Sequence, residues 1–577
     1  MRFPKLKQPT LQTQTQHAFG GYCHRTRVGA GEWYDMQNLT GAHYPTLATR
    51  AARGLYATPS AVGGLCRFDT LLYTDGADLV VRDYRVPLGL VADGKPKKLI
   101  RMGAYVIVMP DKRYVNLANL ADFGGIEAHV TRERVHVRPC RADGVAYTRV
   151  TTSPAAPGAP ADGECVAWID SSSVPTLCEY SAAMAGWMPV DRPHLRLEAG
   201  GIGAPFSLGD GVRFAGLPAG LDGVYTLQHC ESDAIVIAGA LCEEQSIKTL
   251  DVSREMPEMD FVIESGNRLW GCRYGVAANG SVVNEIYASA LGDFRNWSRF
   301  DGAASDSFAV GVGTDGAFTG AVTFGGMPIF FKEHCMHRVG GSYPATYQVY
   351  TSACEGVRAG SDESVVDLGD VLLYHADGGV YLYDGSLPVC VSDALGDVRY
   401  DQAAAGALAG RYYVSMRDRV RGTWHLFVYD TAQRLWHRED DCRARAFCRV
   451  GEMLYFIDGA GRIQSVEAGA HPVAETRIPF YAVSGVIGAD APAHRYLERL
   501  HLRMGLAAGA RVTVSVQYDS IGSFEEIYTT KAKGTRGVTA ILRPRRCDHL
   551  RLRIEGEGDV RLFALTTYLG GGSDHDA

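Results

Sequence analysis

The chain has 577 residues, of which 46% are hydrophobic and 21% are charged; this composition excludes a disordered protein and leaves room for several domains. The formal net charge of −7 argues against a protein that grips nucleic acid over a broad basic face. Glycine is frequent, with 67 residues, so we expect many turns between short strands.

Residues 1–55 are predicted to form an extended arm. Gln12–Gln16 alternates Gln and Thr with almost nothing to bury, so we expect it to order only against a partner. Trp33, Tyr34 and Tyr44 stand in a segment with few aliphatic residues. We expect them either to tuck against the neighbouring domain or to anchor the arm in another subunit, because aromatic side chains contribute strongly to interfaces. Deleting residues 2–40 should then leave a folded but unassembled monomer.

Residues 56–124 and 255–470 share a repeated pattern of apolar residues, Tyr, Asp-Gly and apolar residues. Its copies are Leu71–Val81, Leu372–Tyr383 and Met453–Ile463. Asp-Gly can adopt the positive φ angles that a tight hairpin needs. Repeated small sheets are typical of a β-propeller, and at ~40–50 residues per four-stranded blade the two segments predict about six blades.

Two other segments differ from this pattern. Residues 125–254 contain a Pro/Ala/Gly-rich stretch at Thr151–Pro160 and three short strands joined by tight turns. This predicts an inserted small β domain, either SH3-like or another compact β module. In residues 471–577 apolar and polar positions alternate with period two. This pattern predicts a β-sandwich-like domain or an edge sheet with one solvent-exposed face. The predicted fold class is therefore all-β.

Two clusters could in principle bind a cofactor or a metal. Gly311–Gly316 matches Gly-x-Gly-x-x-Gly, but a β pattern follows where dinucleotide binding needs a helix. On a strand, Cys335 and His337 would share one face and could supply two metal ligands. Packed strand residues are the favoured interpretation of both clusters, so we expect no cofactor and no metal.

Charged clusters could also carry chemistry. Asp440-Asp441 could supply carboxylates to a glycosidase, which needs a facing pair. Arg543–Arg546, with Arg551 and Arg553, could bind phosphate or form a solvated or subunit-facing surface. We expect no catalytic residue, and the fourteen cysteines, without a Cys-x-x-Cys pair, favour buried, reduced thiols. No apolar run approaches the ~18–20 residues that span a bilayer.

The order of several motifs along the chain resembles that of bacteriophage virion proteins built on a propeller. The motifs are Gly20-Gly21, Tyr34–Leu39, Tyr44-Pro45 and Arg50…Arg53-Gly54, then Asn267–Trp270, Ile286–Ser289, Gly292–Trp297, Ile329–Lys332, Cys354–Gly356 and Gly379–Gly385. The nearest class is the tail nozzle, or tail tubular, proteins of short-tailed phages. Residues 125–254 depart from that class.

The resemblance implies a non-enzymatic protein of the virion tail, made in the host bacterial cytoplasm. Identical subunits would form a ring, with six-fold symmetry as one option, on a DNA exit path through which DNA passes without sequence-specific binding. The ring would bridge the head-to-tail adaptor, or portal-proximal proteins, to distal tail proteins or fibres. The expected subunit-interface residues are Trp33, Tyr34, Asn38, Tyr44, Arg50 and Arg53. The alternatives are another virion component (baseplate, receptor-facing or head-surface protein) and a glycan-hydrolysing propeller enzyme.

Overall fold

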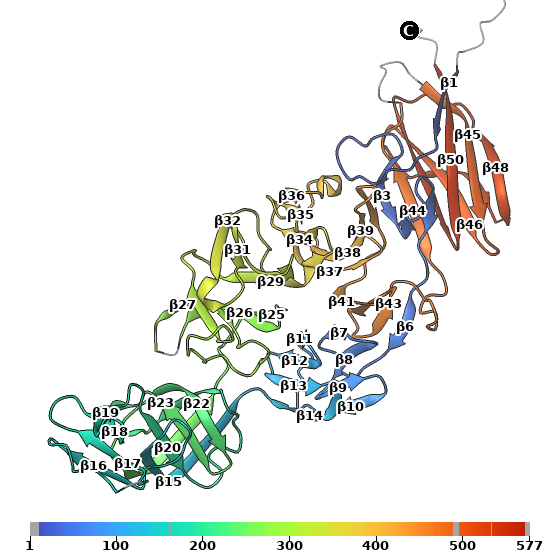
Figure 1. Ribbon diagram of the computed structural model, residues 1–577. Helices are drawn as coiled ribbons and strands as arrows, with labels where there is room; N and C mark the ends of the chain where they lie inside the picture. Colours follow the sequence, from blue (N-terminus) through green and yellow to red (C-terminus); the bar gives the residue numbers. More distant parts are fainter. Residues whose placement is uncertain (1–10, 162, 278, 489–494, 532, 572–577) are drawn as a thin grey trace, which may run out of the picture. The chain divides into compact units, whose positions relative to one another are not determined.

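The computed structural model describes residues 11–161, 163–277, 279–488, 495–531 and 533–571. In these residues nearly all regular structure is β-strand, which confirms the predicted all-β class (Figure 1). The described helical turns are η1 (Pro218–Gly220), η2 (Pro344–Thr346), η3 (Asp362–Ser364) and η4 (Asp393–Leu395). The chain divides into two compact units: unit 1 has residues 1–96, 331–336 and 352–577, and unit 2 has residues 97–330 and 337–351.

Outside residues 125–254, the described residues form seven four-stranded sheets. Four belong to unit 1, with strands β7 (Leu65–Arg67), β8 (Leu71–Asp75), β9 (Asp78–Val81) and β10 (Tyr84–Val86); β33 (Val366–Asp367), β34 (Leu372–Ala376), β35 (Gly379–Tyr383) and β36 (Val389–Cys390); β37 (Tyr400–Leu408), β38 (Arg411–Asp418), β39 (Trp424–Asp430) and β40 (Leu435–Arg438); and β41 (Ala444–Val450), β42 (Met453–Asp458), β43 (Ile463–Ser465) and β6 (Gly54–Ala57). The other three have strands β11 (Lys98–Met102), β12 (Tyr105–Met109), β13 (Arg113–Asn116) and β14 (Asn119–Gly125); β25 (Phe261–Ser265), β26 (Arg268–Val276), β27 (Val282–Ala288) and β28 (Phe308–Gly311); and β29 (Phe318–Phe324), β30 (Met327–Lys332), β31 (Cys335–Gly340) and β32 (Gln348–Ala353).

The Asp-Gly copies form hairpins, as predicted. They are the antiparallel pairs β8–β9, β34–β35 and β42–β43. The expected positive φ is found at Gly76, with φ 64°, whereas in the second copy it lies one residue later, at Gly379, with φ 142°. In the third copy the Asp458 carboxylate fixes the turn by accepting bonds from the backbone N–H groups of Ala460 and Arg462, both at 2.9 Å.

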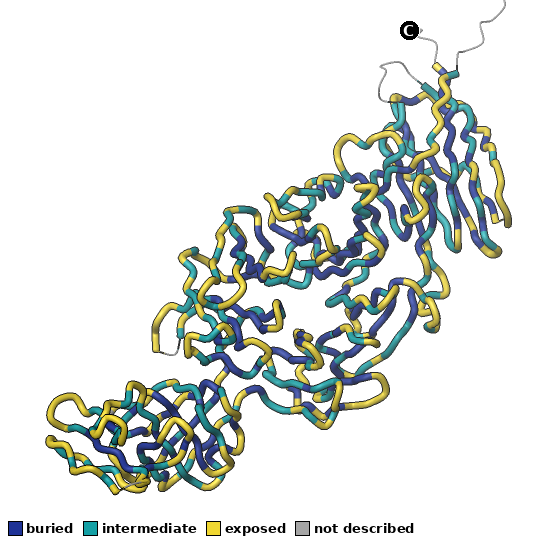
Figure 2. The backbone as a smooth tube through the Cα atoms, in the orientation of Figure 1, coloured by how far each residue is buried: buried dark blue, intermediate teal, exposed yellow. Residues whose placement is uncertain are grey.

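Consecutive sheets within each unit pack through apolar clusters. In unit 1, β37 lies against β41 and β41 against β7, with Tyr413, Leu454 and Phe456 buried in the first of these contacts. In unit 2, β11 lies against β25 and β25 against β29, and Trp270 and Phe318 are buried in the second contact. Figure 2 shows the buried residues concentrated in the sheets and the exposed residues in the loops.

Two six-stranded sheets complete unit 1. One contains β4 (Leu39–Thr40), β5 (Leu47–Thr49), β50 (Val560–Gly571), β45 (Arg495–Leu506) and β48 (Gly534–Ile541), with β1 (Leu11–Gln16) also paired to β50; the other contains β2 (Gly21–Tyr22), β3 (Glu32–Gln37), β44 (Pro479–Ser484), β49 (Leu550–Glu557), β46 (Arg511–Tyr518) and β47 (Glu525–Thr530). Their apolar faces share one core, in which Leu502 of β45 and Val514 of β46 are buried. The period-two alternation of the sequence therefore marks the inner faces of these sheets.

Residues 128–254, in unit 2, form a closed barrel and a small sheet. The barrel runs β15 (Ala128–Cys140), β20 (His194–Glu198), β23 (Ala234–Ala238), β22 (Gly223–Glu231), β21 (Gly211–Ala215) and β24 (Gln245–Arg254); the sheet runs β16 (Arg149–Ser153), β17 (Val166–Asp170), β18 (Thr176–Ser181) and β19 (Gly186–Pro189). Val135, Leu195 and Ile237 are fully buried in the barrel core. The barrel meets the rest of the unit where the Asn296 amide donates to Gly209 O at 2.7 Å and accepts from Gly211 N at 3.1 Å.

The expectation that Gln12–Gln16 orders only against a partner is wrong, and the described residues 11–55 contribute strands to the sheets of their own chain. β1 pairs with β50, from Leu11 opposite Gly570 to Gln16 opposite Leu565, and β3 pairs with β44. Figure 1 shows these blue N-terminal strands among the orange and red C-terminal strands. The Gln-Thr stretch has little to bury, but its backbone groups complete a sheet within the same chain. Deleting residues 2–40 would therefore remove sheet strands and core side chains, rather than release a folded monomer.

Candidate functional site

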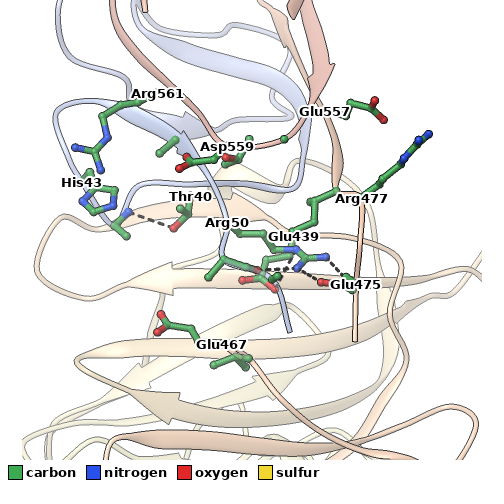
Figure 3. Close-up of a pocket in the computed structure, with 18 of the residues that line it drawn as sticks. Thr40, His43, Arg50, Glu439, Glu467, Glu475, Arg477, Glu557, Asp559 and Arg561 are labelled. Carbon is green, nitrogen blue, oxygen red and sulfur yellow. Dashed lines mark hydrogen bonds and ion pairs between the residues drawn. The ribbon is translucent and has the colours of Figure 1, made fainter. Parts of the chain in front are cut away.

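A polar cleft of about 760 Å³ opens in unit 1 (Figure 3). Its walls come from residues 40–52, the start of β38, residues 466–478 and the loops at 508–509 and 557–561. Segments from both ends of the chain therefore meet in this cleft.

Two buried arginines lie at the cleft: Arg50 is part of its lining, and Arg53 is nearby. The Arg50 guanidinium makes paired contacts with Glu475, Nη1 to Oε2 at 2.7 Å and Nη2 to Oε1 at 2.8 Å. The Arg53 guanidinium makes paired contacts with Asp440, Nη1 to Oδ2 at 2.7 Å and Nη2 to Oδ1 at 3.0 Å, and Nη2 also donates to Glu439 Oε2 at 3.1 Å. Such bidentate pairs are the strong and directional form of the arginine–carboxylate bond.

Asn38 connects this network to the surrounding backbone. Its Oδ1 accepts a bond from Arg50 Nε at 2.7 Å, and its Nδ2 donates to Pro479 O at 2.7 Å. Its φ of 56° lies in the left-handed region, which asparagine tolerates better than most residues. The network formed by Asn38, Arg50, Arg53, Glu439, Asp440 and Glu475, called here the arginine network, thus joins the N-terminal segment to residues 439–440 and 475–479.

Burial and pairing set the charges of the arginine network. Burial alone would lower the pKa of Arg53, but attraction by Asp440 and Glu439 outweighs it and raises the pKa. Burial raises the pKa of Glu439, and Arg53 and Arg50 offset only part of that effect. Burial would also raise the pKa of Glu475, but its hydrogen bonds from Arg50 lower it. Arg53 thus stays charged, and Glu475 ionises more readily than an ordinary glutamate.

This chemistry is suited to holding segments of the chain together. A glycosidase needs one carboxylic acid that can give its proton to a leaving group and a second carboxylate facing the reaction centre. Here Glu439, Asp440 and Glu475 each accept a bond from an arginine of the same network. The bonds from Arg50 favour the charged form of Glu475, which makes Glu475 a poor general acid, whereas burial raises the pKa of Glu439.

The rim of the cleft carries both signs of charge. Burial lowers the pKa of His43, and the nearby Arg561 and Arg411 lower it further. Figure 3 draws His43 beside Arg561, with Asp559 and Glu557 along the same edge of the cleft. The rim therefore presents neither a purely basic nor a purely acidic face.

The structure corrects most of the expected subunit-interface residues. Trp33, Asn38, Arg50 and Arg53 are buried within their own chain, with 2%, 4%, 7% and 3% of their surface exposed, so their side chains are not available as anchors to a neighbour. Trp33 packs in the core between the six-stranded sheets. Tyr34 is half-buried and lies under the guanidinium of Arg551, 4.9 Å from the ring centre. Tyr44 is 43% exposed, and an interface role for it stays a prediction.

The other sequence clusters lie in separate local arrangements. Gly311 ends β28, and β29 follows at Phe318, so strand rather than helix follows the Gly-x-Gly-x-x-Gly match. Both ring nitrogens of His337 contact hydroxyls, Nε2 to Thr314 Oγ1 and Nδ1 to Thr351 Oγ1, each at 2.9 Å. These contacts occupy the nitrogen atoms that a metal ion would need.

The charged clusters are likewise divided among different partners. Asp440 joins the arginine network, whereas Asp441 accepts from Arg438 Nη2 at 2.6 Å and lies 2.8 Å from His425 Nδ1. Arg545 pairs with Glu525 at 2.9 Å, and Arg553 pairs with Glu555 at 2.7 Å. Within the described parts of the chain, no group of three or more His, Cys, Asp and Glu residues could hold a metal ion. None of the helices among those residues is long and apolar enough to cross a bilayer.

Sequence reasoning missed Glu439 and Glu475 as the partners of Arg50 and Arg53. Glu439 stands next to Asp440-Asp441 in an acidic run, which was a usable signal for a site that holds a cation. Glu475 follows Ala474 in an unremarkable stretch, and nothing in the local pattern marks it.

No protein-family model and no curated protein matches the sequence. Among solved structures, one similar chain is a glycoside hydrolase family 43 arabinoxylan arabinofuranohydrolase from Bacillus subtilis, in complex with cellotetraose. It is 10% identical, with 54% of this chain and 94% of that chain covered and a TM-score of 0.14. Another is described as the extracellular domain of a hybrid two-component system from B. thetaiotaomicron, 8% identical, with 89% and 99% covered and a TM-score of 0.19. Likenesses at these TM-scores carry no argument about the fold or the function of this chain.

Proposed function

We propose that this protein is a non-enzymatic structural subunit of a bacteriophage tail, of the nozzle or tail tubular class. In this proposal the seven four-stranded sheets are the blades of a β-propeller, and identical subunits assemble into a ring on the DNA exit path. The observation that carries the proposal concerns the motifs on which the resemblance to phage proteins rests. In each unit, residues of these motifs bond to one another although they are separated in sequence.

In unit 1, residues of the N-terminal motif bond to one another and to the arginine network. Asn38 accepts from Arg50 Nε at 2.7 Å, and Arg50 N donates to Asn38 O at 3.1 Å. Gly54, which ends the motif, pairs with Ser465 in the sheet of β41–β43 and β6. These positions therefore serve one structural purpose, which supports reading them as a single motif.

In unit 2 the motifs Asn267–Trp270, Ile286–Ser289 and Gly292–Trp297 are bonded to one another in the same way. Leu269 N donates to Ser289 Oγ at 3.0 Å, Ser289 N donates to Leu269 O at 2.8 Å, and Gly292 N donates to Asn267 O at 2.9 Å. The buried Arg268 donates to the carbonyls of Ser289, Asp306 and Ala304 at 2.7, 2.5 and 2.8 Å. The three motifs thus fix one another around β26 and β27.

Native mass spectrometry of the concentrated full-length chain, with electron microscopy of the same sample, tests the proposal. We expect a closed ring of identical subunits whose individual images show a circular array of small sheets. A chain that stays monomeric at every concentration and hydrolyses a cell-wall or capsular glycan would overturn the proposal. Peripheral attachment to virions would instead indicate another virion component.

A variant of Tyr44 tests the ring interface directly. Tyr44 is the exposed residue among the expected interface residues, with 43% of its surface exposed. Tyr44→Ser should weaken the ring while the circular dichroism spectrum of the chain stays unchanged. Tyr84→Ser, at an aromatic side chain that is 67% exposed in β10, is the matched control and should leave the ring intact.

A further inference from the structure

A second cleft in unit 1 gathers arginines. It has a volume of about 580 Å³ and is lined by Arg25, Arg399, Arg421 and Arg551 together with Asp397 and Asp418. This volume lies within the ~300–1,000 Å³ range of small-molecule sites. Four arginines against two aspartates leave an excess of positive charge, in contrast to the mixed rim of the first cleft.

One of the two carboxylates is already used by the fold. Asp418 is 2% exposed, and its Oδ1 accepts bonds from the backbone N–H groups of Val420 at 2.8 Å and Arg421 at 2.9 Å. These bonds shape the turn between β38 and β39. The negative charge of Asp418 is therefore turned toward its own loop, where its Oδ2 also lies 3.6 Å from Arg421 Nη1, and Asp397 is the exposed carboxylate of the lining.

Two of the guanidiniums have no carboxylate partner among the described residues. Arg551 lies over the Tyr34 ring, and its buried Nε has no hydrogen-bond partner in the described part of the chain. Arg399 donates from Nη1 to Gly378 O at 3.3 Å, a long bond to a neutral acceptor. Both side chains keep donors that an anion could use.

The aromatic rings beside these arginines are already stacked. The His24 ring lies 4.4 Å from the Tyr34 ring with 28° between their planes, and Arg551 lies 4.9 Å from the same ring. A nucleic-acid base would need an open ring face to stack upon. Recognition in this cleft therefore depends on charged donors rather than on ring stacking.

Backbone bonds hold the walls of the cleft in place. His24 N donates to Ala394 O at 2.7 Å, and Arg419 N donates to Arg399 O at 2.9 Å. The His24 Nδ1 atom also lies 3.0 Å from Tyr34 O. The loops that carry the arginines are thus fixed before a ligand arrives, which reduces the cost of ordering them on binding.

We propose that this cleft binds the phosphate groups of a ligand that carries at least two of them, either a free polyphosphate or a nucleic-acid backbone. The planar guanidinium fork matches phosphate oxygens. Arg25 and Arg421 each have one carboxylate nearby, Glu32 at 3.5 Å and Asp418 at 3.6 Å. Together with the two arginines that have none, they suit a ligand with closely spaced, multiple negative charges. The proposal is independent of the tail assignment.

Isothermal titration calorimetry of the full chain with tripolyphosphate and with a short duplex DNA tests it. The variant Arg399→Gln/Arg421→Gln should weaken binding by about 10-fold or more, since it removes two charged donors from the cleft. Arg419→Gln is the matched control, because this arginine is exposed in the same hairpin but does not line the cleft; binding should be unchanged. Binding of tripolyphosphate identifies the free source, and binding of duplex DNA alone identifies the backbone source.

Three results would overturn the proposal: no binding of either probe, equal binding by wild type and the double variant, or equally tight binding of citrate. A second measurement on the wild-type chain does not depend on the variant folding. Tripolyphosphate or duplex DNA should slow the modification of Arg421 by phenylglyoxal, as read by mass spectrometry, and leave Arg419 unaffected. Equal modification of both residues with and without the probes would contradict the site.

Discussion

At the scale of single residues, the main finding is that the arginines of the N-terminal motif are internal. Arg53 is 3% exposed and lies 5.3 Å from the Phe456 ring centre while it pairs with Asp440 and Glu439. The guanidinium compensates the charge of two carboxylates at a buried position where water cannot solvate them. Removing it would leave Glu439 and Asp440 with only their longer contacts to Arg50, at 4.0 and 3.4 Å.

We therefore expect Arg53→Met to lower the free energy of unfolding by about 3–5 kcal/mol. Arg449→Met, which breaks the exposed pair between Arg449 and Glu452 at 3.2 Å, should cost less than about 1 kcal/mol. Urea unfolding followed by tryptophan fluorescence measures both. Equal stability of the two variants would show that the arginine network contributes nothing to the fold.

Two buried histidines give the stability of unit 1 a pH dependence. Burial lowers the pKa of His375 to about 3, with a smaller contribution from Arg358, and burial lowers the pKa of His437 to about 4. Both stay neutral in the folded chain at pH values where the unfolded chain, with a histidine pKa of about 6.5, takes up a proton. Their contribution is therefore complete above pH ~6.5 and is lost as the pH falls toward the folded-state values.

We expect the free energy of unfolding to fall by up to about 1.4 kcal/mol per pH unit for each histidine between pH ~6 and ~4. His375→Asn, which cannot take up this proton, should make the decline shallower. Thermal unfolding of both proteins across this pH range gives the comparison. A variant whose decline is as steep as that of the wild type would remove His375 from the explanation.

At the scale of elements, the hairpins could be predicted and the N-terminal strands could not. Asp-Gly between Tyr-rich apolar flanks marks β8–β9, β34–β35 and β42–β43, because turn chemistry and apolar flanks lie within about ten residues of each other. β1 joins β50 by backbone hydrogen bonds across more than 500 residues, and a Gln-Thr stretch carries no pattern that names its partner. Arg50 and Arg53 were predicted at an interface for the same reason: their carboxylate partners are distant in sequence.

The β3 strand allows a direct test of this integration. Trp33→Ala should destabilise unit 1 by about 3–5 kcal/mol, because it removes a large side chain from the core between the six-stranded sheets. Tyr84→Ala, at the exposed side chain in β10, should change stability by less than about 0.5 kcal/mol. Differential scanning fluorimetry measures both, and a Trp33→Ala protein as stable as wild type would restore the view of this segment as an arm.

At the scale of the whole molecule, residues 128–254, which form the closed barrel and the small sheet and are called here the barrel module, are the part most nearly independent of its surroundings. Its first and last strands pair at their ends, with Ala128 opposite Arg254, so the chain enters and leaves at nearly the same point. Its core cluster draws on residues between Val130 and Val252. A segment with adjacent ends and its own core can fold as a unit.

Residues 127–255 expressed alone should therefore fold into a protease-resistant barrel. The full chain with residues 128–254 replaced by a Gly-Gly link should keep its remaining β structure, because the link joins two neighbouring ends. Circular dichroism and limited proteolysis check both products. An isolated module that is digested as quickly as a denatured chain would show that the barrel depends on the rest of unit 2.

The pairing of β6 with β43, and of β1 with β50, also constrains biosynthesis. A ribosome releases β6 and β1 hundreds of residues before the strands that complete their sheets. Until β43 and β50 have been synthesised, these early segments must wait with unpaired edges, which are prone to wrong associations. Unit 1 is therefore expected to mature only after β50 has left the ribosome, and a chain terminated before β50 should be insoluble rather than a smaller folded protein.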